Sequence, residues 1–380
     1  MDLAVYVHFP WCVQRCPYCD FATSAIQPER IDHEGYAGAV AAELALRRAT
    51  VGPGRRPART LFFGGGTPSL WSLPSLARVV DAVRPEDEVT VECNPTSIDA
   101  ERARALRGAG VNRLSLGVQS LRDRHLRYLG RAHDADEALS AVRAAASSGL
   151  RVSADVMFGM DAQRADELVE DVRALAGEGA EHLSCYMLTV EPATRFGELA
   201  RKGRLPRLCD DEVAALYERC AEAMESLGFE HYEVSNWARP GQRARHNEAY
   251  WRGDDYLGLG AGAVGCVASP RGAEGALRWR NLHDPAAYRA ALDRGELPPS
   301  ELESLDPDAR VREGLMLGLR TADGVDLEAL ASRAGVDPMR GRERAVRREV
   351  DRGNLVLEGG RARIPRGRWL LADAITARVF

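Results

Sequence analysis

The sequence predicts an α/β protein: a partial (β/α)6 barrel of the TIM type, followed by a C-terminal α+β domain of winged-helix-like pattern. Short β-rich runs alternate with helix-period segments through the first two-thirds of the 380 residues, which predicts the barrel. The turns after the β-rich runs carry glycine or polar side chains, as at the functional edge of such barrels. Three helical segments before a hairpin pattern predict the C-terminal domain.

Six strands and six helices are expected in the barrel, which we assign to residues 1–230. The strands are expected at Leu3–His8, Thr60–Phe63, Val89–Cys93, Arg113–Leu116, Arg151–Met157 and His182–Leu188. The helices are expected at about Glu34–Arg48, Leu73–Val83, Asp99–Arg107, Ala135–Ser147, Asp166–Ala176 and Asp210–Ser226. Strand–helix alternation requires crossover connections and hence a parallel sheet. Six units are two short of a closed barrel, so we expect an open one.

The pattern changes after residue 230. Tyr232–Trp237 is predicted to be a strand and Asp255–Ala263 a glycine-rich loop, and we assign 231–300 to a segment that extends the barrel. Residues 301–380 are assigned to the winged-helix-like domain. Its helices are expected near Asp308–Leu319, Asp326–Arg333 and Pro338–Arg352, and its hairpin at Leu355–Ile364 with a Gly359-Gly360 turn.

Composition excludes several classes of function. The net charge of −5 argues against binding to nucleic acid, which needs positive charge. Lys202 is the single lysine, whereas phosphate-loop, protein-kinase and pyridoxal sites each need a lysine in a specific context. No apolar run is long enough to span a membrane, and the first residues show no secretory signal, so we expect a cytoplasmic protein.

Three of the eight cysteines, Cys12, Cys16 and Cys19, lie within eight residues. Because Pro10 and Pro17 disfavour a helix there, we expect the thiols to converge from a loop. Thiolates are the ligands of iron–sulfur clusters, and a [4Fe–4S] cluster held by three of them keeps one iron open to another ligand. Structural zinc takes four ligands, for which only His8 and Asp20 are near, but zinc or unliganded thiols stay open as alternatives. The five scattered cysteines are interpreted as structural.

Residues after the predicted strands suit a ligand that combines an amino acid with a nucleoside. The glycines of Gly64–Thr67 would let the backbone approach the ligand closely and present N–H and C=O groups. Glu92 could pair with an α-ammonium and Arg131 with a carboxylate, while Gln119 and Asp155 suit ribose hydroxyls. Each residue alone could equally form a surface ion pair or a turn.

His246 lies beside two aromatic residues, in His246-Asn247-x-x-Tyr250-Trp251. It could ligate a metal or acidify a substrate, or it could simply hydrogen-bond the glycine-rich loop. We favour the hydrogen bond to the loop.

The cysteine loop, the strand ends and this aromatic stretch together resemble the radical S-adenosylmethionine (radical SAM) superfamily. Within it they resemble the group of oxygen-independent coproporphyrinogen III oxidases and HemW haem chaperones. The most specific matching segments are Tyr6–Phe21, Gly64–Ser69, Gly117–Ser120 and His246–Trp251.

The resemblance implies a role for each site residue. Cys12, Cys16 and Cys19 would hold a [4Fe–4S] cluster, whose open iron would bind S-adenosylmethionine (SAM) through its amino and carboxylate groups. Tyr6 and Tyr18 would shape the pocket. The methionine end of SAM would be contacted by Gly65, Gly66 and Thr67, and the site would be completed by Glu92, Gln119, Arg131 and Asp155. One electron from the cluster would cleave the sulfonium and release a 5′-deoxyadenosyl radical.

The two members of the group differ at the cysteine loop. The pattern typical of the oxidases has a fourth cysteine at the position where this chain has Phe21. The resemblance therefore favours the chaperone. That function implies haem as cargo, apo-haemoproteins such as respiratory enzymes as acceptors, and a flavodoxin or ferredoxin as reductant. It also allows a homodimer and a peripheral position at the inner face of the membrane. Relatives often have a histidine in the glycine-rich loop, at the position where this chain has Val264. A haem ligand in that loop is therefore not expected, and His246 is the better candidate.

Three other functions remain open. The main alternative is the oxidase of porphyrin biosynthesis, which decarboxylates propionates of coproporphyrinogen III to vinyl groups. A radical methyltransferase and a DNA-binding redox regulator are the others. Cleavage of SAM is open for the chaperone, because a similar fold alone does not fix function.

Overall fold

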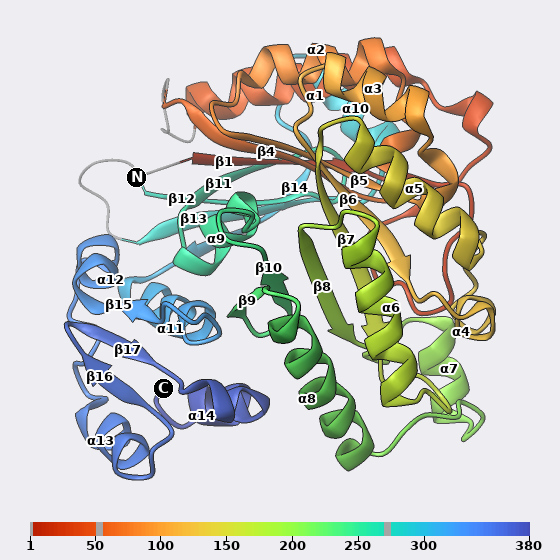
Figure 1. The fold of residues 1–380 in the computed structure, drawn as a ribbon. Coiled ribbons are helices and arrows are strands. Elements are labelled where there is room, and N and C mark those ends of the chain that lie inside the picture. The colour runs from red at the N-terminus through yellow and green to blue at the C-terminus, as the bar shows by residue number, and fades with distance from the viewer. Residues whose placement is uncertain (1–2, 51–55, 270–274) are drawn as a thin grey trace.

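The computed structural model describes residues 3–50, 56–269 and 275–380, and it confirms the predicted fold class (Figure 1). The prediction that the chain has no secretory signal rests on its first residues. Of these, Met1 and Asp2 lie outside the described residues. None of the helices in the described ranges is both long and apolar enough to cross a bilayer.

Six parallel strands form the centre of a twelve-stranded sheet and are neighbours in chain order. They are β1 (Leu3–Phe9), β4 (Ala58–Gly65), β5 (Glu88–Cys93), β6 (Arg113–Gln119), β7 (Arg151–Phe158) and β8 (His182–Met187). This is the order of successive β/α units in a TIM-type barrel, left open after six. All six predicted strands are confirmed, with ends that differ by a few residues.

Helices in the connections cover one face of this sheet (Figure 1). They are α1 (His33–Thr50), α2 (Leu73–Val83), α3 (Ala100–Gly108), α5 (Ala135–Ser147), α6 (Ala165–Gly177) and α8 (Asp210–Ser226). Two short helices, α4 (Asp123–Tyr128) and α7 (Arg195–Arg201), were not predicted, and single 3-10 turns η1 (Pro28–Arg30), η2 (Pro68–Leu70) and η3 (Pro95–Ser97) lie in loops. The six predicted helices are confirmed.

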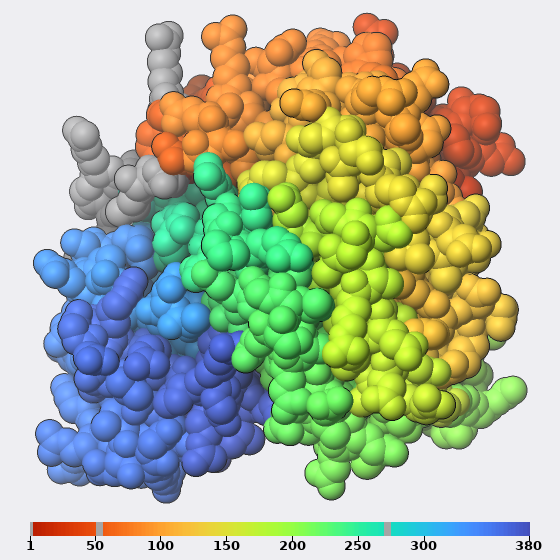
Figure 2. Space-filling view, viewed as in Figure 1, coloured from red at the N-terminus to blue at the C-terminus, as the bar shows by residue number. Residues whose placement is uncertain are grey.

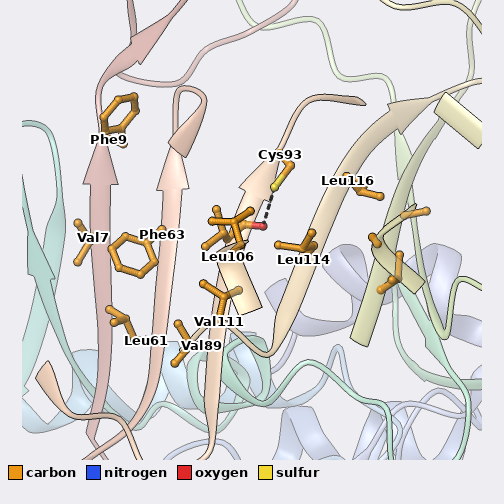
Figure 3. Packing of buried hydrophobic residues seen from close by; sticks show 14 of the residues in the cluster. Val7, Phe9, Leu61, Phe63, Val89, Cys93, Leu106, Val111, Leu114 and Leu116 are labelled. Carbon is orange, nitrogen blue, oxygen red and sulfur yellow. Dashed lines mark hydrogen bonds between the residues drawn. The ribbon is translucent and has the colours of Figure 1, made fainter. Parts of the chain in front are cut away.

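Side chains of the parallel strands alternate between two environments, since successive residues of a strand point to opposite faces. Figure 3 shows the apolar set, which packs against the helices and includes Val7, Phe63, Val89 and Leu114 in one buried cluster. Parallel sheets covered on both faces are usually apolar throughout. Here most of the alternate residues are polar, with Ala4, Phe62 and Met157 as exceptions, so the inner face of the open barrel is suited to hold something other than a helix.

Further strands extend the sheet at both edges. β11 (Asp255–Leu259) pairs in parallel with β1, and β12 (Val264–Ala268), β13 (Ala276–Asn281) and β14 (Ser300–Leu305) follow antiparallel. At the other edge lie β10 (Asn236–Ala238) and β9 (Glu230–Glu233). Helices α9 (Arg245–Arg252) and α10 (Pro285–Asp293) belong to this part of the chain. The sheet therefore continues to residue 305, past the expected boundary at 300.

The single strand predicted at Tyr232–Trp237 is wrong. The chain forms a hairpin there, in which Asn236 of β10 pairs with Glu233 of β9 and with Ser184 of β8. The Glu233 carboxylate accepts hydrogen bonds from the Ser235 N–H and the Asn236 side chain. These bonds close a turn at a position where the apolar–polar alternation alone suggested a continuous strand.

The C-terminal module has a core of its own, which includes Val311, Leu315, Ile364 and Trp369. Its elements are α11 (Pro307–Gly318), β15 (Val325–Asp326), α12 (Leu327–Ala334), α13 (Glu343–Asp351), β16 (Val356–Glu358), β17 (Arg361–Arg363), η4 (Arg366–Leu371) and α14 (Ala372–Ala377). The predicted hairpin is confirmed as β16 and β17, and β15 adds a third strand. In Figure 2 the module forms a blue lobe beside the green edge of the barrel.

The third helix of the module begins at Glu343, five residues later than predicted. Asp337 explains the difference, because its side chain and its carbonyl accept hydrogen bonds from the N–H groups of Met339 and Arg340 and so form a separate turn. Arg342 then donates to Asp308 of α11 at 2.6 Å, which ties α13 to the first helix of the module.

One buried carboxylate ties α1 to the far edge of the sheet. Glu43 accepts hydrogen bonds from Arg47 Nε (3.2 Å), the Gly260 N–H (2.9 Å), Asn281 Nδ2 (2.9 Å) and the Tyr288 hydroxyl (2.8 Å). A buried charge is tolerated only when it is paired and hydrogen-bonded, and this one is. The network joins α1, the loop after β11, β13 and α10.

Replacing Glu43 should therefore destabilise the whole sheet. We expect Glu43→Ala to lower the free energy of unfolding by about 3–5 kcal/mol, because Arg47 is left buried without its counter-charge. Glu34→Ala, at an exposed position of the same helix, should cost less than about 1 kcal/mol. Urea unfolding followed by circular dichroism measures both, and equal losses would contradict the role of the network.

Candidate functional site

The three clustered cysteines lie on a loop at the carboxyl end of β1. The loop begins with β2 (Trp11–Cys12) and returns through β3 (Ser24–Ala25), and the two pair in parallel. Two further hydrogen bonds join the same segments, from the Ser24 N–H to the Pro10 carbonyl (2.8 Å) and from the Ile26 N–H to the Cys12 carbonyl (2.9 Å). A turn links the Cys19 N–H to the Cys16 carbonyl (3.2 Å). The predicted non-helical loop is confirmed.

The glycine-rich end of β4 holds this loop in place. The Gly66 N–H donates to the Phe9 carbonyl (2.7 Å) and the Thr67 N–H to the Trp11 carbonyl (2.8 Å). A side chain at Gly66 would overlap the Trp11 carbonyl, and Gly65 has φ +109°, a conformation that favours glycine. The glycines do allow a close approach of the backbone, but its partner is the cysteine loop.

We had expected these backbone N–H groups to face a ligand. The structure differs, because the Gly65 N–H donates to Glu92 Oε2 (3.0 Å) and the next two donate to the loop. All three donors therefore have acceptors within the protein.

His8 and Tyr6 anchor the other side of the loop. His8 Nε2 lies 2.8 Å from the Ala22 carbonyl, and the Tyr6 hydroxyl lies 2.9 Å from His8 Nδ1. Burial lowers the pKa of His8 to about 4, so the ring is neutral at pH 7. Nε2 must then donate to Ala22 and Nδ1 must accept from Tyr6. Both ring nitrogens are in use, so His8 is not placed as a fourth metal ligand.

Any metal centre in this loop would have to stabilise the cysteines as thiolates. Among the described residues, no three Cys, His, Asp or Glu side chains converge on one ion. A [4Fe–4S] cluster binds each thiolate at a different iron and needs no such convergence. Burial raises the pKa of the Cys12 and Cys19 thiols, and neighbouring cysteines raise it further, so thiolates here need a strong positive partner. An iron–sulfur cluster supplies one.

Arg131 connects the cysteine loop to the barrel. Its Nη1 lies 3.5 Å from Cys16 Sγ, and its Nη2 donates to Asn94 Oδ1 (2.6 Å) and to the Gly117 carbonyl (2.8 Å). Its Nε is buried with no acceptor among the described residues, so one donor is left for a ligand. Asn94, which also donates to Thr67 Oγ1 (3.1 Å), was not predicted as a site residue. Its position directly after β5 was the signal that could have identified it.

Two carboxyl groups, Glu92 and Asp155, lie on the inner face of the barrel. Burial, together with the nearby Asp155, raises the pKa of Glu92 to about 8. Burial also raises the pKa of Asp155, although Ser115 donates to its oxygens at 3.3 Å. Two carboxyls that both resist ionisation form a site that a cation would stabilise. An ammonium group fits that requirement.

Gln119 ends β6 in a strained conformation. Its φ is +70°, which costs a non-glycine residue about 1–2 kcal/mol, and the pairing of β6 with β7 shifts register between Leu116 and Gln119. Strain of this kind concentrates at functional sites. The other predicted pocket residue, Tyr18, packs on Phe196 with ring centroids 6.3 Å apart.

His246 lies at the opposite end of the strands. It belongs to α9, and its ring nitrogens contact the hydroxyls of Thr60 (2.8 Å), at the start of β4, and Tyr250 (3.3 Å). The ring stacks on Phe62 with centroids 5.0 Å apart. The predicted hydrogen bond to the glycine loop is therefore wrong. His246 contacts Thr60, which lies four residues before Gly64 on β4, whereas the cysteine loop is held at the Gly64 end of that strand. His246 therefore lies apart from the residues around the cysteines.

Comparison with known proteins connects these features to a family. A family model described as the radical SAM superfamily matches residues 6–175, and one described as the HemN C-terminal domain matches residues 305–370. The heme chaperone HemW of Mycobacterium tuberculosis (strain H37Rv) is 37% identical over 380 residues, which cover 98% of this chain and 93% of that protein. HemW of Escherichia coli is 40% identical over 278 residues and covers 71% of each chain.

A solved structure shows the same fold. Coproporphyrinogen III oxidase (HemN) of Escherichia coli, described as a radical SAM enzyme, covers all of this chain and 90% of its own, with a TM-score of 0.78. Its sequence is 18% identical, so this likeness concerns the fold alone.

The role of the glycines can be tested through iron loading. We expect Gly66→Ala to lower the iron and sulfide bound per chain after anaerobic reconstitution, because a Cβ there pushes the Trp11 carbonyl and the cysteine loop away. Gly177→Ala, at the end of α6 with open space around it, should load like the unmodified protein. Full loading of Gly66→Ala would show that the loop is positioned by other contacts.

Proposed function

The chain belongs to the radical SAM superfamily and, within it, to the family of HemW haem chaperones, and from this premise we propose that it binds haem and delivers it to apo-haemoproteins. The observation that carries the proposal is similarity over nearly the whole chain to proteins named heme chaperone HemW. Both the barrel and the C-terminal module take part in that similarity. Respiratory enzymes are the acceptors that we propose.

The cysteine loop supports the chaperone over the oxidase. Phe21, which stands in place of a fourth cysteine, is exposed and makes no core contact that would demand an aromatic residue. The likeness to HemN concerns the fold, whereas the relatives at 33–40% identity carry the chaperone name. We therefore do not propose decarboxylation of coproporphyrinogen III.

We propose that Cys12, Cys16 and Cys19 hold a [4Fe–4S] cluster and that SAM binds beside it. When bound, the cluster supplies single electrons to the sulfonium of SAM. Arg131 places a positive charge against Cys16 and keeps Nε free for a carboxylate. Glu92 would accept a hydrogen bond from the amino group of SAM, and Gln119 and Asp155 would hold the ribose. Tyr6 acts through His8 to hold the loop, and Tyr18 closes its outer side.

Exposed side chains of the cysteine loop suggest where a reductant protein would dock. Val13 and Phe21 of the cysteine loop expose 58% and 65% of their surface, so a reductant protein such as a flavodoxin or ferredoxin could approach the cluster there. A homodimer, a cytoplasmic location and a peripheral position at the membrane stay predictions.

Binding of SAM should release a proton from Glu92. At pH 7 this carboxyl is protonated, since its pKa is about 8, and the amino group and the positive sulfonium of bound SAM would favour its ionised form. We expect release of roughly one proton per chain at pH 7 and none above about pH 9. Titration calorimetry of the anaerobic cluster-loaded protein, in buffers of different ionisation enthalpy, measures it.

Two variants test whether the Glu92 carboxyl is the source of the released proton. Glu92→Gln should bind SAM more weakly and release about one proton fewer per chain than the unmodified protein, and Glu101→Gln, at an exposed site on α3, should behave like the unmodified protein. Equal proton release by Glu92→Gln would assign the proton elsewhere.

Haem transfer tests the proposed function directly. We expect the cluster-loaded protein to shift the Soret band of added haem and to restore activity to an apo-haemoprotein.

Cys16→Ser should fail to load the cluster, and Cys209→Ser, at an exposed cysteine outside the loop, should load it normally. Absence of both the Soret shift and the transfer would rule out the chaperone, and formation of protoporphyrinogen from coproporphyrinogen III would favour the oxidase.

A further inference from the structure

A cavity of about 590 Å³ separates the inner face of the sheet from the C-terminal module. Its walls come from parts of the chain far apart in sequence: β8 and β10, α9, the edge strands β11 to β13, and helices α11 and α12. The volume falls in the range of roughly 300–1,000 Å³ that small-molecule sites occupy. None of the residues proposed to bind the cluster or SAM lines it.

The walls are rich in aromatic and aliphatic surface. Tyr250 and Tyr256 meet edge to face, with ring centroids 4.7 Å apart, on the side of α9 and β11. Leu317 and Leu330 contribute aliphatic surface from the C-terminal module. Trp251 adds an indole N–H that has no acceptor among the described residues. A large, mostly apolar ligand with a few polar groups would match this lining.

The carboxylates of the cavity already have partners. Glu313 accepts two hydrogen bonds from Arg278 Nη2, at 2.6 and 2.7 Å. Ion pairs join Asp255 to Arg56 (2.8 Å) and Asp254 to Arg252 (2.9 Å). Glu233 binds Asn236, and burial raises its pKa to about 7. Their negative charge is therefore balanced or suppressed.

Two arginines of the lining are not balanced in this way. Arg310 donates from Nη1 to the Gly275 carbonyl (3.2 Å), and no carboxylate of the described residues lies within ion-pair distance of it. Arg333 forms no ion pair or hydrogen bond with a described residue; burial lowers the pKa of its guanidinium, and the more distant Asp254 and Asp326 offset this only in part. Partly buried guanidinium groups that form no ion pair keep N–H donors for a ligand with negative groups.

We propose that this cavity is the haem site of the protein, with the macrocycle among its aromatic and aliphatic walls and the two propionates on Arg310 and Arg333. The inference rests on the proposed function, which it extends from the cargo to its place of binding. Haem is a flat apolar ring with two carboxylates, which matches the lining and the two arginines that form no ion pair. His246 is not its ligand, because both ring nitrogens already have partners.

The place of the cavity relates the cargo to the proposed SAM site. Tyr186, which lines the cavity, lies two residues beyond Ser184 on β8, and Ser184 pairs with Asp155 on β7. The cavity therefore borders the inner face on which Asp155 and Glu92 lie. Because α11 and α12 form one wall, movement of the C-terminal module would open a path for haem to reach an acceptor.

The charge pairing is tested with haemin and with an esterified tetrapyrrole. We expect the double variant Arg310→Gln/Arg333→Gln to bind haemin at least tenfold more weakly than the unmodified protein, because each propionate loses a charge-assisted hydrogen bond. Protoporphyrin IX should show the same loss, whereas its dimethyl ester should bind both proteins equally. Arg347→Gln, at an exposed position on α13, is the matched control and should bind haemin normally.

Leu317→Trp tests the location without removing charge, since the larger side chain fills the cavity and should also weaken haemin binding at least tenfold. Cluster content and thermal unfolding show that each variant is folded. If the unmodified protein binds haemin and both the arginine double variant and Leu317→Trp bind it equally well, the location is overturned while the chaperone function stands. If the unmodified protein itself binds no haemin, the proposed function fails and the location with it.

Discussion

Two backbone hydrogen bonds determine where the chemistry of this protein can take place. They run from the N–H groups of Gly66 and Thr67 to the carbonyls of Phe9 and Trp11, and they fasten the cysteine loop to the end of β4. They form only because Gly65 and Gly66 have no side chains to separate the two strands. The three thiols, Arg131 and the carboxyls of the inner face depend on this attachment for their relative positions.

The fold also leaves a polar inner face on the open barrel. Strands that bury one face against helices and present polar residues on the other leave a lined space in an open barrel. The C-terminal module lies against the open side, with its own hydrophobic core, and so encloses a cavity that neither part contains alone. The proposed cluster, cofactor and cargo would therefore have separate places within this interior.

Local sequence patterns predicted most of the fold. The six strands and six helices of the barrel were placed correctly because their signals, apolar periodicity and capping residues, act within one element. One error lies at the predicted glycine-rich loop Asp255–Ala263, whose first five residues form β11 because they pair with β1, and two lie where a side chain overrides the pattern. Glu233 closes a turn inside the predicted strand at Tyr232–Trp237, and Asp337 delays the start of α13. Both are side chain to backbone hydrogen bonds that hydrophobic periodicity does not show.

The sequence by itself determined the family and the fold class, and it supplied the prediction that Cys12, Cys16 and Cys19 are thiol ligands, because these depend on residue types at short spacing. Only the tertiary structure decided what the glycines hold, where His246 lies and that Arg310 and Arg333 share a cavity. His246 bonds Thr60, 186 residues away, and the two arginines meet the sheet only after the module has packed on it. Such contacts depend on how distant segments pack in three dimensions, and no local pattern along the chain encodes that packing.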